Sequence, residues 1–176
     1  RKQIAELLGR PESSITIDMT RIGGGFGRRL YGDFALEAAE ISSLANTPVK
    51  VVYSREDDMT AGIYRPGSKY KFRAAIKDGR MVAYHLVGTG ANMGNATREN
   101  NFPACTLDHY LVESHELKSN ITTGAWRAPI TNFLAYAEQS FFDEVASELG
   151  QDPVQFRLDL FAKAKENPVG DLQYDV

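Results

Sequence analysis

The chain has 176 residues, which is enough for one domain or two small ones with a real hydrophobic core. Its 43% hydrophobic and 24% charged residues are typical of an ordinary globular protein. The formal net charge of -3 argues against nucleic acid as the main partner, since phosphate binding requires a basic surface.

The N-terminal third is predicted to alternate helices and strands around a glycine loop. A helix over residues 1–8 ends at Gly9. Alternating apolar residues over 15–19 predict a strand that leads into the loop. Helical spacing of apolar residues predicts a helix over 33–46, and a strand follows over 49–53. This order is compatible with a crossover unit that contains a parallel strand pair.

The middle of the chain carries a β-hairpin signal. Residues 70–76 and 81–87 flank Asp78-Gly79, a dipeptide that suits the tight turn between two antiparallel strands. Residues 88–101 are rich in Gly, Asn and Thr, which predicts a loop. A further strand is expected over Leu117–Thr122.

Two helices are predicted at the C-terminal end. An apolar stripe over residues 134–149 indicates the longest helix, which Gly150 ends. Asp152-Pro153 then starts a second helix, as N-cap and first-turn proline. The face of this helix that packs on the core is predicted to comprise Val154, Leu158 and Phe161. The mixture of a strand–glycine loop–helix unit, a hairpin and two terminal helices predicts an α+β fold.

The glycine loop over residues 23–29, Gly-Gly-Gly-Phe-Gly-Arg-Arg, is the first candidate site. It fails the dinucleotide fingerprint, because neither Gly23 nor Gly25 has a glycine at the sixth position of the motif. It also lacks the Gly-Lys-Ser/Thr of a phosphate-binding P-loop. Two interpretations remain equally open: a cradle of backbone N–H groups for an anion or oxo ligand, or a tight turn that only permits close packing.

The second candidate is the segment 124–129, Gly-Ala-Trp-Arg-Ala-Pro. Pro129 restricts Ala128 to extended conformations, so a shaped loop is predicted. Arg127 beside Trp126 suits the stabilisation of negative charge in a flat substrate pocket. Local sequence alone favours the simpler interpretation, a surface arginine stacked on a tryptophan.

The remaining chemical groups predict no site. The three histidines show no metal-ligand spacing, and the acidic run 56–58 is typical of a solvated loop. Cys105 is the single cysteine, so the chain cannot form an internal disulfide or hold an iron–sulfur cluster. No apolar run approaches the ~20 residues of a membrane span. The chain begins at Arg1 rather than Met, which we interpret as a piece of a longer polypeptide whose targeting region and compartment, bacterial cytoplasm or periplasm, stay open.

Several segments together resemble the molybdenum-cofactor-binding large subunit of the xanthine oxidase and aldehyde oxidoreductase family. The resemblance is strongest to the isoquinoline 1-oxidoreductase β-subunit type. Five or more blocks in the expected order make it specific. The blocks are residues 22–27, 48–59, 64–66, 126–129, 138–144 and 150–158.

The resemblance implies an oxidoreductase that hydroxylates an aldehyde or an N-heterocyclic aromatic C–H with oxygen from water at a molybdenum–pterin (molybdopterin) centre. It also implies electron transfer to iron–sulfur clusters on a partner subunit or domain. By the same resemblance, Gly25, Phe26 and Gly27 contact the cofactor through their backbone, and Arg127 orients substrate and stabilises charge as a catalytic residue. Trp126 becomes a wall of the substrate pocket. No metal ligand is expected in this chain.

The chain departs from the family pattern in two places. Arg28 stands where many relatives have a glycine, which suits the isoquinoline type better than the xanthine type. Ala128-Pro129 replaces a glycine-rich stretch of the xanthine type, which bears on the shape of the pocket.

The family's catalytic glutamate and most cofactor-holding segments lie C-terminal to the region matched here. Residues 1–165 are therefore expected to be a fragment of a cofactor-binding domain, either as one body or as two subdomains that meet near residues 60–130, with a polar tail over 166–176. The fragment alone is expected to be inactive and to bind no cofactor, and to need the remainder of the large subunit. The alternatives are a non-catalytic scaffold or subunit-interaction module and, more weakly, a phosphate- or nucleotide-binding enzyme that uses the glycine loop.

Overall fold

A computed structural model describes residues 1–98 and 106–166, which form two compact units. Unit 1 comprises Arg1–Arg65 with Gly124–Arg127, and unit 2 comprises Pro66–Thr123 with Ala128–Val176. Cys105 and residues 167–176 of the expected tail lie outside the described residues. Within the described ranges, no helix combines the length and the hydrophobicity needed to cross a bilayer.

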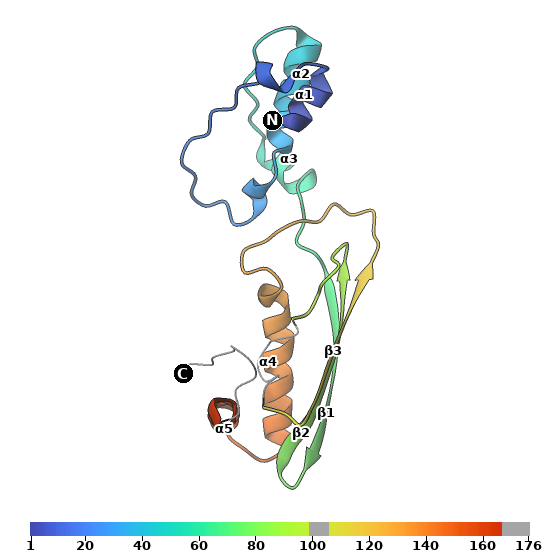
Figure 1. Cartoon of the computed structure of the whole chain (residues 1–176), viewed down its shortest axis with the longest axis vertical. Coiled ribbons are helices and arrows are strands. Elements are labelled where there is room, and N and C mark those ends of the chain that lie inside the picture. Colours follow the sequence, from blue (N-terminus) through green and yellow to red (C-terminus); the bar gives the residue numbers. More distant parts are fainter. Residues whose placement is uncertain (99–105, 167–176) are drawn as a thin grey trace. The chain divides into compact units, whose positions relative to one another are not determined.

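Unit 2 is built on a three-stranded sheet in the order β1-β2-β3 (Figure 1). β1 (Ser68–Lys77) and β2 (Arg80–Ala91) are antiparallel, and β3 (His109–Leu117) runs parallel to β2. Asp78 and Gly79 both have positive φ, 51° and 70°, as the tight hairpin turn requires. The predicted hairpin is therefore confirmed.

Two helices complete unit 2, and α4 runs along one face of the sheet (Figure 1). α4 (Thr131–Glu148) ends before Gly150, whose φ is 65°, and α5 (Pro153–Glu166) begins after Asp152. The Asp152 carboxylate accepts hydrogen bonds from the amides of Val154 and Gln155, at 3.0 and 2.8 Å. Both predicted helices and the Asp152 cap are confirmed.

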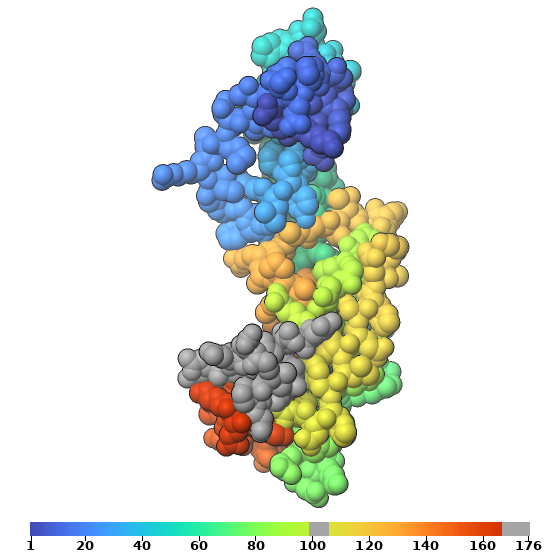
Figure 2. Space-filling model, in the orientation of Figure 1, coloured from blue at the N-terminus to red at the C-terminus, as the bar shows by residue number. Residues whose placement is uncertain are grey.

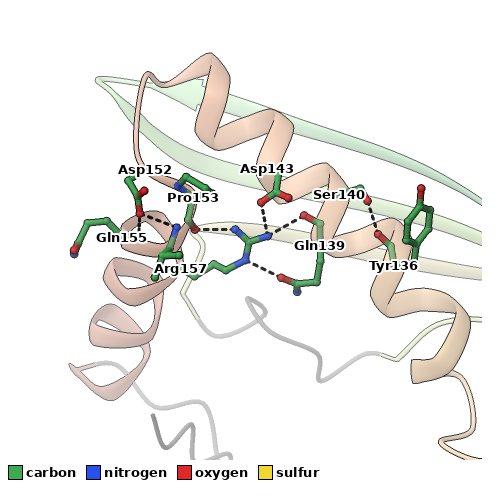
Figure 3. Close-up of polar contacts among 9 residues, drawn as sticks. Tyr136, Gln139, Ser140, Asp143, Asp152, Pro153, Gln155 and Arg157 are labelled. Atoms are coloured by element: carbon green, nitrogen blue, oxygen red, sulfur yellow. Dashed lines mark hydrogen bonds and ion pairs between the residues drawn. The ribbon is translucent and has the colours of Figure 1, made fainter.

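Arg157 joins α5 to α4 (Figure 3). Its guanidinium donates to the side-chain and main-chain oxygens of Gln139, at 2.7 and 2.9 Å, and to the carbonyl of Pro153, at 2.7 Å. It also pairs with Asp143 at 2.8 Å and lies over the Phe142 ring. These contacts give Arg157 a structural role.

The core of unit 2 lies between α4 and the sheet. Tyr84, Leu86, Leu134 and Phe142 are fully buried there. The Tyr84 ring stacks on Tyr110 of β3, with centroids 5.4 Å apart. The Tyr84 hydroxyl donates to the buried Glu138 carboxylate at 2.9 Å, so a polar link joins β2 to α4 inside the core.

Four predictions for unit 2 are wrong in whole or in part. Ala128 has a φ of 52°, in the left-handed region, and not the extended conformation expected before Pro129. The loop predicted over 88–101 is wrong for Gly88–Ala91, which continue β2, whereas residues 92–98 form neither helix nor strand. A Cβ at Gly88 would lie 2.4 Å from the Thr97 methyl, so glycine lets this loop approach the strand. The strand predicted over Leu117–Thr122 is absent, because β3 ends at Leu117. The Asn92 side chain holds the segment that follows β3: it accepts a hydrogen bond from the Ser119 amide and donates one to the Ile121 carbonyl. The buried face of α5 comprises Phe156, Leu160 and Ala164 instead of Val154, Leu158 and Phe161.

Unit 1 contains short helices joined by long irregular segments. They are α1 (Lys2–Leu8), η1 (Glu12–Ser14), η2 (Arg28–Leu30), α2 (Asp33–Ala45) and α3 (Arg55–Thr60). The predicted helices over 1–8 and 33–46 are confirmed, and each ends at a left-handed residue, Gly9 and Asn46. Ser54 and Asp57 form a capping box at α3, so part of the acidic run has a helix-starting role.

The two strands predicted for unit 1, over 15–19 and 49–53, are wrong, and so is the crossover unit built from them. Neither segment pairs with another strand among the described residues, and a strand exists only through such pairing. Ile17 and Met19 are exposed, Met19 by 85%, whereas Val49, Val51 and Tyr53 are half-buried without pairing as a strand.

Unit 1 also lacks a developed core. All its residues are described, and Ala5 alone is buried. Its blue and cyan segments leave openings between them in the space-filling view (Figure 2). Hydrophobic stabilisation grows with the apolar area removed from water, so unit 1 gains less from its own packing than unit 2 does.

Candidate functional site

The glycine loop has the backbone conformations that its sequence requires. Gly24 and Gly27 have φ of 66° and 98°, and Phe26 has φ of 47°. A positive φ is unusual for a bulky residue and stores strain that surrounding contacts must hold. η2 follows at once, with the Arg28 amide donating to the Gly25 carbonyl at 2.9 Å.

The loop packs directly on the segment 124–127. A Cβ on Gly27 would lie 2.5 Å from the Ala125 carbonyl oxygen, a distance too short for a Cβ atom. A Cβ on Gly124 would likewise lie 2.4 Å from Ile63. The Ala125 amide donates to the Tyr31 hydroxyl at 2.6 Å. Both glycines are therefore required by close approach, and the approach of Gly27 to Ala125 brings the two candidate segments together.

Arg127 contacts the loop through both its backbone and its side chain. Its amide donates to the Phe26 carbonyl at 2.9 Å, and its guanidinium lies 5.2 Å from the centroid of the Phe26 ring. Phe26 and Trp126 remain 54% and 45% exposed. Phe26, Gly27, Trp126 and Arg127 thus form one exposed surface within unit 1, which we call the Phe26–Arg127 patch.

The loop offers unused hydrogen-bond donors. Among the described residues, the amides of residues 23–27 donate no hydrogen bond. Cβ atoms placed on Gly23 or Gly32 would meet nothing within 4 Å, so the backbone on the outer side of the loop is open. Clustered, unpartnered N–H groups of this kind suit an anionic or oxo ligand.

Two contacts around this patch were not predicted from the sequence. Arg28 forms a two-point ion pair with Asp33, at 2.9 and 2.8 Å, and the hydrogen bonds of this pair lower the pKa of Asp33 and raise that of Arg28. The Tyr53 hydroxyl donates to the Glu37 carboxylate, a bond that raises the pKa of Tyr53 to about 12. The sequence did contain a signal for the ion pair of Arg28 with Asp33: an arginine stands five residues before an acidic residue in the first turn of a predicted helix.

The three histidines set aside in the sequence lie elsewhere, in unit 2. His85 bonds Glu113 at 2.7 Å, and His115 lies 4.0 Å from the same carboxylate. No group of three His, Cys, Asp or Glu is arranged for a metal ion within residues 1–98 and 106–166. Two surface hollows lie on unit 2, one along β2 and β3 beside His85 and one between the hairpin turn and α5. Neither is lined by the Phe26–Arg127 patch, where the chemically suited groups gather, so we assign them no function.

Comparison with known proteins relates most of the chain to one family. The model of the molybdopterin cofactor-binding domain matches residues 1–161. A membrane-bound aldehyde dehydrogenase [pyrroloquinoline-quinone] of Gluconacetobacter polyoxogenes is 29% identical over 93% of the chain and 24% of its own length. The isoquinoline 1-oxidoreductase subunit beta of Brevundimonas diminuta is 28% identical over 88% of the chain and 22% of its own length.

The fold has a counterpart among solved structures. Quinoline 2-oxidoreductase from Pseudomonas putida 86 superposes with a TM-score of 0.71 over 97% of the chain and 23% of its own, at 19% identity. This likeness supports the α+β fold with its sheet and helices. The chain spans about a quarter of the length of each of these proteins.

Proposed function

The chain belongs to the molybdopterin cofactor-binding domain family, and from this premise we propose that it supplies part of the active site of a molybdenum hydroxylase. The complete enzyme would hydroxylate an aldehyde or an N-heterocyclic aromatic C–H with oxygen from water. The names of relatives that act on aldehyde and isoquinoline support this substrate class.

The glycine loop fits a molybdenum–pterin cofactor. The cofactor's oxo groups accept hydrogen bonds, and the amides of residues 23–27 are donors without a partner in the described part of the chain. Gly25, Phe26 and Gly27 would hold the cofactor through these amides. When bound, the cofactor supplies the two-electron chemistry that hydroxylation requires.

Arg127 would orient the substrate and stabilise negative charge that develops on it. The Phe26 ring under the guanidinium, 5.2 Å away, restricts where that charge can lie. A fixed positive group acts most strongly on the transition state when it does not need to reorganise. Trp126 would supply a flat apolar wall beside it. The observation that carries the proposal is the direct contact of Arg127 with Phe26, through both backbone and side chain.

A pair of glycine substitutions in the full-length subunit tests this assignment. Gly27→Ala places a methyl group 2.5 Å from the Ala125 oxygen at a φ of 98°, whereas Gly23→Ala meets nothing within 4 Å. We expect Gly27→Ala to lower kcat by about tenfold or more, because small displacements of reacting groups are costly. Gly23→Ala should stay within a factor of about two, since a surface substitution changes little. Equal activity of the two variants would remove the loop from the active site.

The cofactor itself is measured in the same preparations by metal analysis and by fluorescence of the released pterin. We expect about one molybdenum and one pterin for each wild-type subunit, as a single site requires. The name of one relative specifies pyrroloquinoline quinone, so quinone is assayed as well. Quinone without molybdenum would overturn the cofactor assignment.

The remaining parts of the enzyme would come from outside this chain. These are the remainder of the large subunit and iron–sulfur clusters on a partner subunit or domain, which accept the electrons. We propose that the 176 residues alone are inactive and hold no cofactor. Turnover by this chain alone would contradict that.

Two alternatives remain, and the same variants test the first of them. The exposed apolar residues of unit 1 favour a docking module. In a docking module, Gly27→Ala would weaken the assembly of the subunits and leave turnover by the assembled enzyme unchanged. A phosphate-binding role for Arg28 and Arg29 is weaker, because the guanidinium of Arg28 is held by Asp33.

A further inference from the structure

The ion pair between Arg28 and Asp33 lies next to the Phe26–Arg127 patch but contributes no atom to it. We propose that this pair positions Phe26 and Gly27, by tying the end of the glycine loop to the start of α2. The inference rests on the proposed function, since the geometry that it maintains is that of the proposed site.

The pair has the geometry of a rigid tie. Both terminal nitrogens of Arg28 donate to Asp33, one to each carboxylate oxygen, at 2.9 and 2.8 Å. Two parallel charge-assisted bonds fix orientation as well as distance. The two side chains are 29% and 35% exposed, so solvent screens them less than a fully exposed pair. The guanidinium also lies 5.5 Å from the centroid of the Phe34 ring, which holds it on a second side.

The tie acts on the backbone that carries the strain. Arg28 directly follows Gly27, and its amide donates to the Gly25 carbonyl at 2.9 Å. Asp33 is the first residue of α2, where the helix dipole favours a carboxylate. The pair therefore links the two ends of the short stretch from Arg28 to Asp33, so a movement of Asp33 would be passed to the loop.

The loop is held on its other side by Arg127. The Arg127 amide donates to Phe26, and Gly27 packs on Ala125. Phe26, with a φ of 47°, lies between the ion pair on one side and the contacts with Ala125 and Arg127 on the other. Loss of the ion pair would release one side of a strained residue, and relaxation of Phe26 would shift the ring that supports the Arg127 guanidinium.

The anchor for this tie is itself fixed. One turn beyond Asp33 on α2, Glu37 accepts a hydrogen bond from the Tyr53 hydroxyl. The N-terminal half of α2 therefore attaches to the glycine loop through Asp33 and to the segment before α3 through Glu37. A helix held at two points transmits less movement to the loop than a free one.

The chain offers a matched control in the next residue. Arg29 is exposed, and among the described residues its side chain makes no hydrogen bond or ion pair. It shares the charge and size of Arg28 and differs in lacking the tie. An effect of net charge or of general basicity near the site would appear equally at both positions.

The test uses the full-length, cofactor-loaded enzyme with Arg28→Ala, Asp33→Ala, the exchanged pair Arg28→Asp/Asp33→Arg, and Arg29→Ala. We expect both single variants at the tie to lower kcat by about tenfold, with KM within about twofold, because the loop acts on the reacting groups. Molybdenum content should not change. The exchanged pair should recover part of the loss, and Arg29→Ala should match the wild type.

A second readout does not depend on activity. Hydrogen exchange of the amides over residues 23–30 should become faster in Arg28→Ala and not in Arg29→Ala, at an unchanged Tm. If Arg28→Ala fails to fold, Arg28→Lys keeps the charge without the two-point geometry and should show the same pattern to a smaller degree.

Three outcomes would overturn the inference. They are equal exchange and kcat in the Arg28 and Arg29 variants, loss of molybdenum in step with loss of kcat, and an exchanged pair no better than the single variants. The proposed function has its own test, since Gly27→Ala acts on the loop and keeps both side chains of the ion pair. A normal Gly27→Ala enzyme would remove the proposed site, whereas an impaired one beside a normal Arg28→Ala enzyme would remove only the tie.

Discussion

At the scale of single residues, close approach explains why this chain needs glycine at two separate positions. Gly27 and Gly124 each face atoms that a Cβ would meet, at 2.5 and 2.4 Å, whereas Gly23 faces open space. A glycine-rich sequence alone does not distinguish these cases, because it reports only that side chains are missing. The contacts of the neighbouring segment decide which glycine matters.

Arg127 carries the residue-scale prediction for the complete enzyme. Arg127→Ala removes a positive charge that is held over the Phe26 ring. We expect kcat to fall by about 10²- to 10³-fold, with a smaller change in KM, because the charge acts mainly on the transition state. Steady-state kinetics with the enzyme's own substrate measure both values. The exposed Arg29→Ala serves as control, and kinetics like that control's would contradict a role for Arg127.

At the scale of elements, the sheet of unit 2 is joined to α4 by a polar link inside an apolar core. Tyr84 of β2 donates to Glu138 of α4 at 2.9 Å, and both residues are buried. Burial, and next the charge of Glu138, raise the pKa of Tyr84 well above its ordinary value. The hydroxyl therefore remains a donor throughout the usual pH range, and the carboxylate retains that donor.

The link leads to a prediction for stability. Tyr84→Phe removes the donor from one oxygen of a buried carboxylate and should destabilise the protein by about 1–3 kcal/mol. Tyr136→Phe is the matched control, since Tyr136 lies on α4, as Glu138 does, and is 82% exposed. Thermal unfolding of both variants measures the difference. Equal Tm values would mean that the hydrogen bond of Tyr84 to Glu138 adds nothing to the stability of the core.

At the scale of the whole molecule, the two units differ in how much of their own surface they bury. The residues of the main core all belong to unit 2, whereas Ala5 alone is buried in unit 1. The Phe26–Arg127 patch lies in the less well packed unit. Contacts with the remainder of the subunit would therefore contribute to holding it in place.

This difference predicts unequal protection from hydrogen exchange. In the 176-residue chain, amides of α2 should exchange faster than amides of β2 and α4, because local opening costs less where fewer apolar contacts are broken. In the full-length subunit the protection of α2 should rise, while that of β2 should change less. Mass spectrometry of the exchanged peptides follows both units at once. Equal protection of the two units in the short chain would contradict the prediction.

The sequence by itself determined the elements whose signals are local. The Asp78-Gly79 turn, the Asp152 cap and the glycine or asparagine ends of α1, α2 and α4 were all predicted, because a turn or a cap depends on residues a few positions apart. The family was also predicted, since ordered blocks of residues are a property of the sequence. The roles of Gly25, Phe26, Gly27, Trp126 and Arg127 stay predictions.

Only the tertiary structure decided which segments pair and which candidate residues meet. The alternating residues 15–19 and 49–53 have the pattern of strands but no partner among the described residues, while β3 gains its place by pairing with β2. Likewise, the contact of Phe26 with Arg127 joins residues about a hundred positions apart, and the tie of Arg28 to Asp33 depends on the path of the chain after Gly27. Pairing and close approach are properties of two segments together, so neither segment's sequence contains them.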